Sequence, residues 1–157
     1  MRPYPEEVLR AIQTGVMTHL LPEVQSSYAK AQFSFSMLLF TIVQRDLDTA
    51  VPDLLETNAA LRTLLADTSA ALSTIDAAEA RTGIDAIAAL PPPTESLRLS
   101  HLRADNDALR GVLSSLAPLI EPAADVPSLA PLRDVRAAIF AHLSADARRR
   151  IVPILTV

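Results

Sequence analysis

The sequence predicts an all-α protein, a helical bundle of four main helices plus one or two short helices. Half of the 157 residues are hydrophobic, which is enough apolar material for a single helical-bundle domain over residues 1–157. Apolar residues recur three and four positions apart along most of the chain, as they do on one face of a helix. The chain has only three glycines, and its twelve prolines cluster between the periodic segments, where they begin or end helices.

A first helix is predicted over residues 5–21. Pro5 suits the first helical position, and Glu6 and Glu7 favour the positive end of the helix dipole. The apolar stripe of this helix comprises Leu9, Ile12, Val16 and Leu20. Pro22 then predicts a break, because proline lacks an amide donor and disfavours helical geometry at the residue before it.

A second helix is predicted over residues 22–48, and it is apolar on two sides. One stripe comprises Tyr28, Ala31, Phe35, Leu38 and Ile42. The other comprises Phe33, Met37, Phe40 and Leu47. Because both sides need cover, this is either the central helix of the bundle or a helix shared with a second subunit. Phe33, Met37 and Phe40 are therefore candidate interface residues.

Neither a membrane span nor a signal peptide is expected. The most apolar run, residues 33–43, is shorter than the roughly 20 residues that a helix needs to cross a bilayer. Residues 1–7 lack the apolar core of a signal peptide. The chain has no cysteine, which excludes disulfides and thiolate metal sites and fits a reducing compartment. We therefore expect a soluble, cytoplasmic protein with no membrane partner.

A third helix is predicted over residues 52–75, beginning at a proline. The alanine-rich segment 76–90 is interrupted by Thr82 and Gly83, so we expect only one or two short helical turns there. Three consecutive prolines at 91–93 end this region and form the clearest linker in the chain.

A fourth helix is predicted over residues 94–119 and is followed by a loop at 121–127. A fifth helix is expected over residues 128–143. Ser144 is suited to cap a last short helix at 145–150, because its hydroxyl can accept a hydrogen bond from a free amide of the first turn.

The third and fourth predicted helices share the pattern Asn-x-Ala-Leu-Arg-x-(Leu/Val)-Leu, at residues 58–65 and 106–113. The surrounding stripes step by alternating four and three residues. This is the 3.5-residue period of helices packed side by side with a left-handed twist. The first stripe is Leu54, Asn58, Leu61, Leu65, Thr68, Leu72 and Ile75. The second is Leu99, Leu102, Asn106, Leu109, Leu113, Leu116 and Ile120.

Asn58 and Asn106 occupy the same heptad position, which predicts a polar seam. A buried, unpaired amide costs about 1–3 kcal/mol, and a paired one can set the register of two helices. One hypothesis is that each asparagine finds a partner inside the bundle or across a dimer. They can pair with each other only if their helices run parallel or if two chains meet. The alternative is that each serves the backbone early in its helix or faces water. The shared pattern is either an ancient duplication or a chance match.

The histidines offer a second functional hypothesis. His142 lies on the apolar side of its helix beside Ile139 and Leu143, and His19 borders the stripe of the first helix. A bundle that brought them together would place them inward, where bundles hold metals. However, the sequence has no Glu-x-x-His or His-x-x-x-His pair. We therefore predict no cofactor and no metal, and keep His19 and His142 as the candidates for a small-molecule- or metal-binding bundle, or an enzyme. His101 is expected to face solvent.

Other classes of function lack support in the sequence. A net charge of −4 disfavours nucleic-acid binding. Neither a glycine-rich phosphate loop nor a Gly-x-Ser-x-Gly elbow occurs. The acidic side chains follow the spacing of helix-surface charges, so no catalytic residue is assigned. Residues 148–150 are three arginines, which either complement the negative end of the last helix or face an anionic partner.

The first fifty residues resemble a known family. The resemblance is carried by Met1-Arg2-Pro3, by Leu20-Leu21-Pro22-Glu23-Val24 and by Tyr28-Ala29-Lys30-Ala31-Gln32. These segments are similar to an uncharacterised family of small helical bacterial proteins. Their genes are often found near acyl-CoA-dehydrogenase-like and aminoglycoside-phosphotransferase-like enzymes. The resemblance implies an accessory role beside an enzyme that acts on acyl thioesters or phosphorylated small molecules, and it supplies no active-site residue.

The expected function is that of a non-catalytic interaction or accessory protein that forms a homodimer. The apolar excess of the second predicted helix is the reason, because it exceeds what one neighbouring helix can cover. A neighbouring enzyme is the other expected partner.

Overall fold

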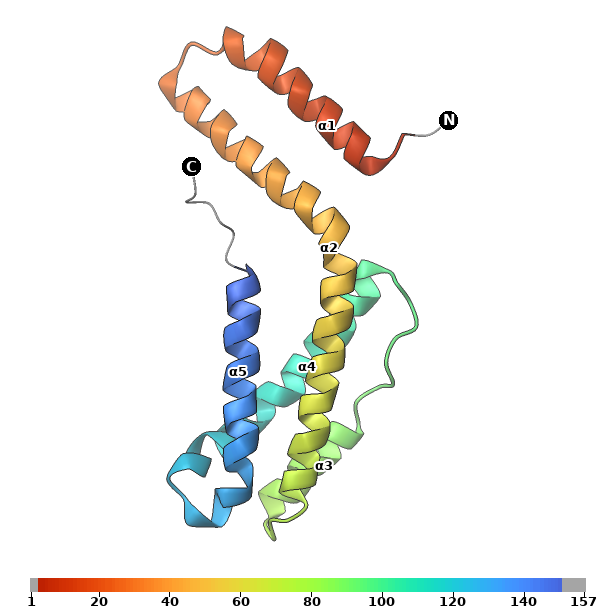
Figure 1. Ribbon diagram of the computed structural model, residues 1–157, viewed down its shortest axis with the longest axis vertical. Helices are drawn as coiled ribbons and strands as arrows, with labels where there is room; N and C mark the ends of the chain where they lie inside the picture. The colour runs from red at the N-terminus through yellow and green to blue at the C-terminus, as the bar shows by residue number, and fades with distance from the viewer. Residues whose placement is uncertain (1–2, 151–157) are drawn as a thin grey trace. The chain divides into compact units, whose positions relative to one another are not determined.

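The computed structural model describes residues 3–150, and within this range the protein is helical and contains no strand (Figure 1). The predicted all-α class is confirmed. The chain divides into two compact units, residues 1–50 and residues 51–157, where the sequence predicted a single domain. One long helix, α2 (Ser27–Leu72), belongs in part to each unit. No helix in the described range is both long and apolar enough to cross a membrane.

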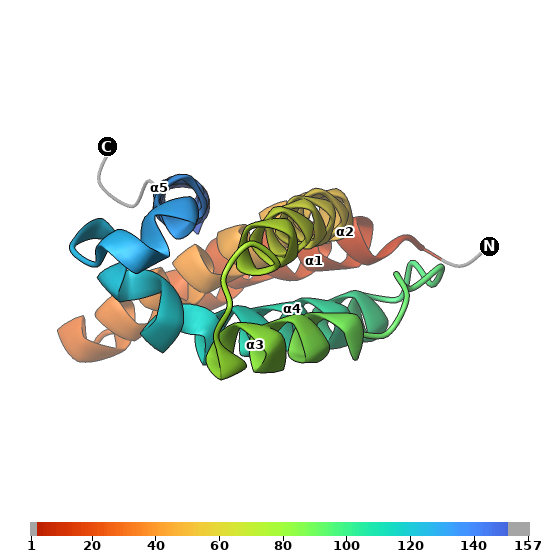
Figure 2. The same cartoon turned by 90° about the horizontal axis from the view of Figure 1, so that it is seen from below.

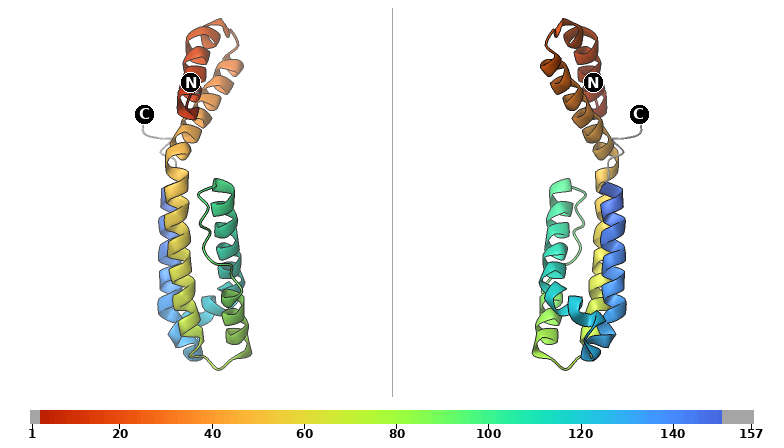
Figure 3. Two further views of the ribbon diagram at one scale, coloured as in Figure 1. Left: turned by 90° about the vertical axis from the view of Figure 1, so that its right-hand side faces the viewer. Right: turned by 90° about the vertical axis from the view of Figure 1, so that its left-hand side faces the viewer.

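The first unit is a helical hairpin. Its elements are α1 (Pro5–Gly15), the π-helix η1 (Val16–Leu20), the 3-10 turn η2 (Leu21–Glu23) and residues 27–50 of α2. Pro5 lies in the first turn of α1 as predicted, and the amide of Tyr4 donates to the carboxylate of Glu7 at 3.0 Å. The predicted break at Pro22 is present, but the prediction that Pro22 begins the second helix is wrong. Pro22 lies inside η2, and α2 begins at Ser27. α1 lies antiparallel beside the first part of α2 (Figures 1 and 3).

The predicted division of α2 at Pro52 is wrong. The sequence predicted one helix ending at residue 48 and another beginning at 52, but α2 continues through Pro52. Proline inside a helix removes one amide donor, here the partner of the Asp48 carbonyl, and its ring crowds that carbonyl. The neighbouring residues include several good helix formers and no glycine. We therefore attribute the continuity of α2 to the helix-forming segments on both sides of Pro52.

The second unit has two layers of helices. Its elements are residues 51–72 of α2, α3 (Ala78–Ala88), α4 (Leu99–Ile120), the 3-10 turns η3 (Glu121–Ala124) and η4 (Pro127–Leu132), and α5 (Arg133–Arg150). Residues 51–72 of α2 and α5 form one layer, and α3 and α4 form the other (Figures 2 and 3).

Gly83 does not break the segment after α2. α3 is a helix of 11 residues that passes through Gly83, where the sequence predicted only one or two turns. Gly83 is buried, and a Cβ atom there would lie 2.8 Å from Cδ2 of Leu116 and 3.1 Å from Cδ1 of Leu72. The glycine is therefore a position of close helix packing.

α4 begins at Leu99, five positions after the predicted start at residue 94. The preceding backbone makes local hydrogen bonds that compete with a helix. The amide of Ser96 donates to Oγ1 of Thr94 at 3.2 Å, and the amide of Arg98 donates to Oγ of Ser96 at 3.2 Å. These bonds keep residues 94–98 outside the helix.

The last helix also differs from the prediction. Instead of a helix over 128–143 and a separate one capped by Ser144, α5 is continuous through Ser144. Residues 127–132 form the 3-10 turn η4. Ser144 is followed by alanine and arginine residues, which are strong helix formers, and no glycine or proline interrupts α5.

The core of the second unit is built from the two predicted stripes. Their members are buried except at the ends, where Leu54, Ile75 and Leu99 are half-buried. α2 and α4 run parallel (Figure 3), since Asn58 meets Asn106 near the start of the contact and Gly83 touches both Leu72 and Leu116 further along. Leu132, Val135 and Ile139 complete the core from η4 and α5.

Candidate functional site

A buried asparagine pair joins α2 and α4. Asn58 and Asn106 are each 5% exposed. Nδ2 of Asn106 donates to Oδ1 of Asn58 at 2.7 Å, and Nδ2 of Asn58 donates to the Leu102 carbonyl at 3.0 Å. Both side chains thus have protein partners in the seam, and neither faces water.

Asp105 extends this network to the linker before α4. Its carboxylate accepts from Nη2 of Arg62 through one oxygen and from Nδ2 of Asn58, at 3.4 Å, through the other. Nη1 of Arg62 donates to the Pro91 carbonyl at 3.0 Å. The Asp105 side chain is 7% exposed and that of Arg62 is 22% exposed. The ion pair therefore ties the proline-rich linker to the seam.

Arg110 extends the network to α5. Its Nε donates to Oδ1 of Asn106 at 2.9 Å, and its Nη2 donates to Oδ2 of Asp146 at 2.5 Å. The two copies of the Asn-x-Ala-Leu-Arg pattern therefore place their arginines differently. Arg62 binds an aspartate on α4, and Arg110 binds one on α5. The network connects three helices through paired groups, so the role that its geometry supports is to set the register of the helices.

The arginines at the end of α5 have separate surroundings. Arg149 is exposed and forms an ion pair with Glu56 of α2 at 2.6 Å. The hydrogen bond to Glu56, followed by its negative charge, raises the pKa of Arg149 above the ordinary arginine value. Arg148 is exposed, and the side chain of Arg150 lies outside the described residues. Two roles were considered for residues 148–150: complementing the negative end of the last helix, or facing an anionic partner. Arg149 has an anionic partner, Glu56, within its own chain.

The histidines differ in their burial. His19 is exposed on η1 in the first unit, and His101 is exposed on α4. His142 is half-buried and lines a cavity of about 40 Å³ with Asp146, Arg149 and other residues. Its Nε2 atom is buried and has no hydrogen-bond partner among the described residues. Within the described range, no three histidine or acidic side chains are grouped so that they could hold a metal ion.

The first unit exposes its apolar side chains. None of residues 3–50 is buried, in contrast to the second unit. Large hydrophobic residues are exposed on both arms of the hairpin. On the first arm and its turns these are Tyr4, Val8, Ile12, Met17 and Leu20. On α2 they are Tyr28, Phe35, Leu39, Val43 and Leu47. We refer to these ten residues as the hairpin surface.

The two predicted stripes of α2 differ in exposure. The candidate interface residues Phe33, Met37 and Phe40 are half-buried. Phe35, which belongs to the other predicted stripe, is 57% exposed, and Leu39 beside it is 46% exposed. The pattern of the sequence revealed both stripes, but it contained no signal for which one is the more exposed.

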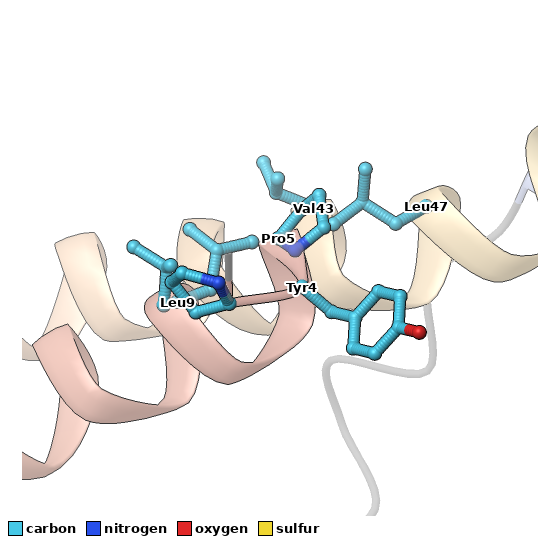
Figure 4. A pocket seen from close by; sticks show the side chains of 7 residues that line it. Tyr4, Pro5, Leu9, Val43 and Leu47 are labelled. Carbon is cyan, nitrogen blue, oxygen red and sulfur yellow. The ribbon is translucent and has the colours of Figure 1, made fainter. Parts of the chain in front are cut away.

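An apolar groove of about 770 Å³ lies between the start of α1 and residues 43–47 of α2. Figure 4 shows Pro5 and Leu9 of α1 facing Val43 and Leu47 of α2, with the ring of Tyr4 extending beyond them. Among the described residues, no charged side chain lines the groove. It is therefore suited to apolar groups.

No protein-family model, curated protein or solved structure matches this chain. The resemblance of the first fifty residues to a bacterial family stays a prediction, and Met1 and Arg2 of its opening motif lie outside the described residues.

Proposed function

We propose that the protein is a non-catalytic helical interaction protein that forms a homodimer through the hairpin surface of its first unit. The observation that carries this proposal is the contrast in burial. Residues 3–50 include ten exposed large hydrophobic side chains and no buried residue, whereas the second unit has a closed core.

The physical argument rests on the cost of exposed apolar area. Burying a phenylalanine or leucine side chain contributes about 1.5–3 kcal/mol relative to leaving it in water. A hairpin without a buried residue gains little of this free energy by itself. Large exposed apolar surface is characteristic of protein interfaces. Phe35 and Leu39 of α2, four positions apart, mark the centre of the surface that we assign to the dimer.

The charge distribution favours a second copy of the chain as the partner. No charged residue occurs between Lys30 and Arg45 of α2. In a two-fold symmetric interface each residue meets the same surface of the other copy, so a charged patch of one sign would repel itself. An uncharged apolar surface carries no such penalty.

The cellular setting rests on the composition of the chain and on the family resemblance. The absence of cysteine supports a cytoplasmic location. The family resemblance supports a bacterial accessory protein, and the hairpin surface is where a neighbouring enzyme would bind if the homodimer did not form.

The test is the mass of the protein in solution. Light scattering after size-exclusion chromatography is expected to give a dimer at micromolar concentration. Phe35→Glu places a charge on the hairpin surface and is expected to give a monomer. Ser34→Glu adds the same charge one position earlier, away from the apolar stripe, and is expected to remain dimeric. A monomeric wild-type protein would refute the homodimer, and a dimeric Phe35→Glu variant would refute this interface.

A single-cysteine experiment locates the contact independently. The native chain has no cysteine, so each introduced thiol is the only one present. Spin labels at Leu39→Cys are expected to show a shorter distance between the two copies than labels at Asp107→Cys on α4. The opposite order of distances would contradict the proposed surface.

A further inference from the structure

A second cavity, of about 210 Å³, lies between α4 and α5 in the second unit. Its apolar lining includes Leu113, Ile139, Phe140 and Leu143. Two guanidinium groups, those of Arg110 and Arg136, line the same space. Small-molecule sites typically combine an apolar lining with a few polar groups that orient the ligand.

The two arginines of this cavity differ in their partners. Arg110 already binds Asn106 and Asp146. Arg136 has no ion pair or hydrogen bond among the described residues, and its Nε atom is buried. Its guanidinium lies over the ring of Phe140, 4.8 Å from the ring centre. This stacking holds the guanidinium against the apolar wall, and its buried Nε–H has no acceptor among the described residues.

The contrast with Arg62 shows why Arg136 is unusual. Nε of Arg62 is also buried without a hydrogen-bond partner, but the guanidinium of Arg62 is paired with the carboxylate of Asp105. A buried Nε–H of a guanidinium that forms no ion pair is costly, because this donor has lost water without gaining an acceptor. An arginine presents its donors in a planar fork that matches a carboxylate.

We propose that the cavity between α4 and α5 binds a small carboxylate with a short apolar tail, with Arg136 pairing with the carboxylate. The tail would lie against Ile139 and Leu143. At about 30 Å³ for a group the size of water, the cavity holds roughly seven such groups, which suits a short-chain acid. The proposal does not depend on the homodimer, because the cavity lies wholly in the second unit.

Two other polar side chains line the cavity and bear on affinity. Ser114 has a hydroxyl that can donate to the ligand, and Glu121 has a carboxylate that opposes an anion. Glu121 is exposed, so water and salt weaken its effect. The proposal therefore predicts that Glu121→Gln binds the carboxylate more tightly than the wild-type protein does, and that the difference shrinks at high salt.

The experiment uses sodium hexanoate as the probe and the full chain as the protein. Calorimetry is expected to show saturable binding, and the Nε–H signal of Arg136 in the NMR spectrum is expected to shift with the same dissociation constant. Arg136→Gln is expected to weaken binding by about ten- to a hundredfold, because a charge-assisted hydrogen bond is lost. Arg148→Gln removes an exposed arginine from the same helix and is the matched control.

Hexan-1-ol separates recognition of the carboxylate from simple filling of an apolar cavity. It carries a tail of the same length without the charge, and it is expected to bind at least ten times more weakly than hexanoate. Equal binding of the two probes, or no saturable binding of hexanoate, would overturn the proposal. These comparisons need only the wild-type protein, so they decide the question even if Arg136→Gln does not fold. Unchanged affinity in a folded Arg136→Gln variant would also overturn it.

Discussion

Asn106 donates its side-chain amide to Oδ1 of Asn58 at 2.7 Å, across two helices that run parallel. Both residues are 5% exposed, so neither can exchange this bond for one with water. A shift of either helix by one position would leave a buried amide unpaired, at a cost of about 1–3 kcal/mol. The pair therefore sets the register of α2 against α4, in addition to holding the two helices together.

The asparagine pair predicts strong energetic coupling. Asn58→Ala removes the acceptor of Asn106 and the donor to the Leu102 carbonyl, so we expect the free energy of unfolding to fall by about 2–3 kcal/mol. A cycle with Asn106→Ala should show a coupling energy of about 1 kcal/mol or more. The measurement is urea unfolding at one protein concentration. Asp107→Ala, at an exposed neighbour, should change stability by less than about 0.5 kcal/mol. Additive single effects would mean that the two side chains do not interact.

Two ion pairs should differ sharply in their contribution. Asp105→Ala leaves the half-buried guanidinium of Arg62 without its counter-charge and is expected to cost about 3 kcal/mol. Asp76→Ala breaks a pair with Arg81 whose side chains are 91% and 74% exposed, and it should cost less than about 0.5 kcal/mol. Thermal unfolding of the two variants compares them directly. Equal losses would show that the Asp105 pair is as solvated as the exposed one.

The glycines of α3 and α4 should respond in opposite ways to alanine. Gly111→Ala meets no atom within 4 Å and should stabilise the protein by about 0.5–1 kcal/mol through helix propensity. Gly83→Ala brings a Cβ atom against buried Leu72 and Leu116. The cost of this overpacking, about 1–3 kcal/mol, should exceed the gain in helix propensity, so the variant should be less stable. Chemical denaturation checks both signs. Stabilisation by Gly83→Ala would show that the two leucines move aside at little cost.

Pro52→Ala tests the continuity of α2. Because the helix passes through this position, alanine restores an amide donor to the Asp48 carbonyl and removes the ring from the helix interior. We expect stabilisation of the order of 1–3 kcal/mol, together with protection of the new amide from hydrogen exchange. An unprotected amide at residue 52 and unchanged stability would indicate two separate helices, as the sequence predicted.

Sequence periodicity predicted the structure best where one apolar stripe packs against one neighbouring helix. The stripes through Leu61 and Leu109 predicted the core of the second unit, because apolar residues at a 3.5-residue period fit only a packed helix seam. The helix propensity of a single residue predicted the wrong helix boundary at two positions. Pro52 and Gly83 are both helix breakers in isolation, yet both lie inside helices whose flanking residues favour them.

The candidate sites depend on which side chains meet in three dimensions, and no pattern along the sequence contains this information. Asp105 and Asp146 were not among the predicted site residues, because an aspartate next to a seam looks like any surface charge until its partner is known. Arg136 was not singled out either. Its significance comes from its buried Nε, which has no hydrogen-bond partner among the described residues, and that depends on the surrounding helices.

The sequence by itself determined that the chain is helical, which residues form the seams of the second unit, and that Asn58 and Asn106 occupy equivalent positions. These features follow from local periodicity, since a helix converts spacing along the chain directly into a face. The tertiary structure decided that α2 and α4 run parallel, that the two asparagines pair, and that the first unit exposes its apolar residues. Helix direction and burial depend on contacts between residues far apart in the chain, and the free energy of those contacts is not encoded at any one position.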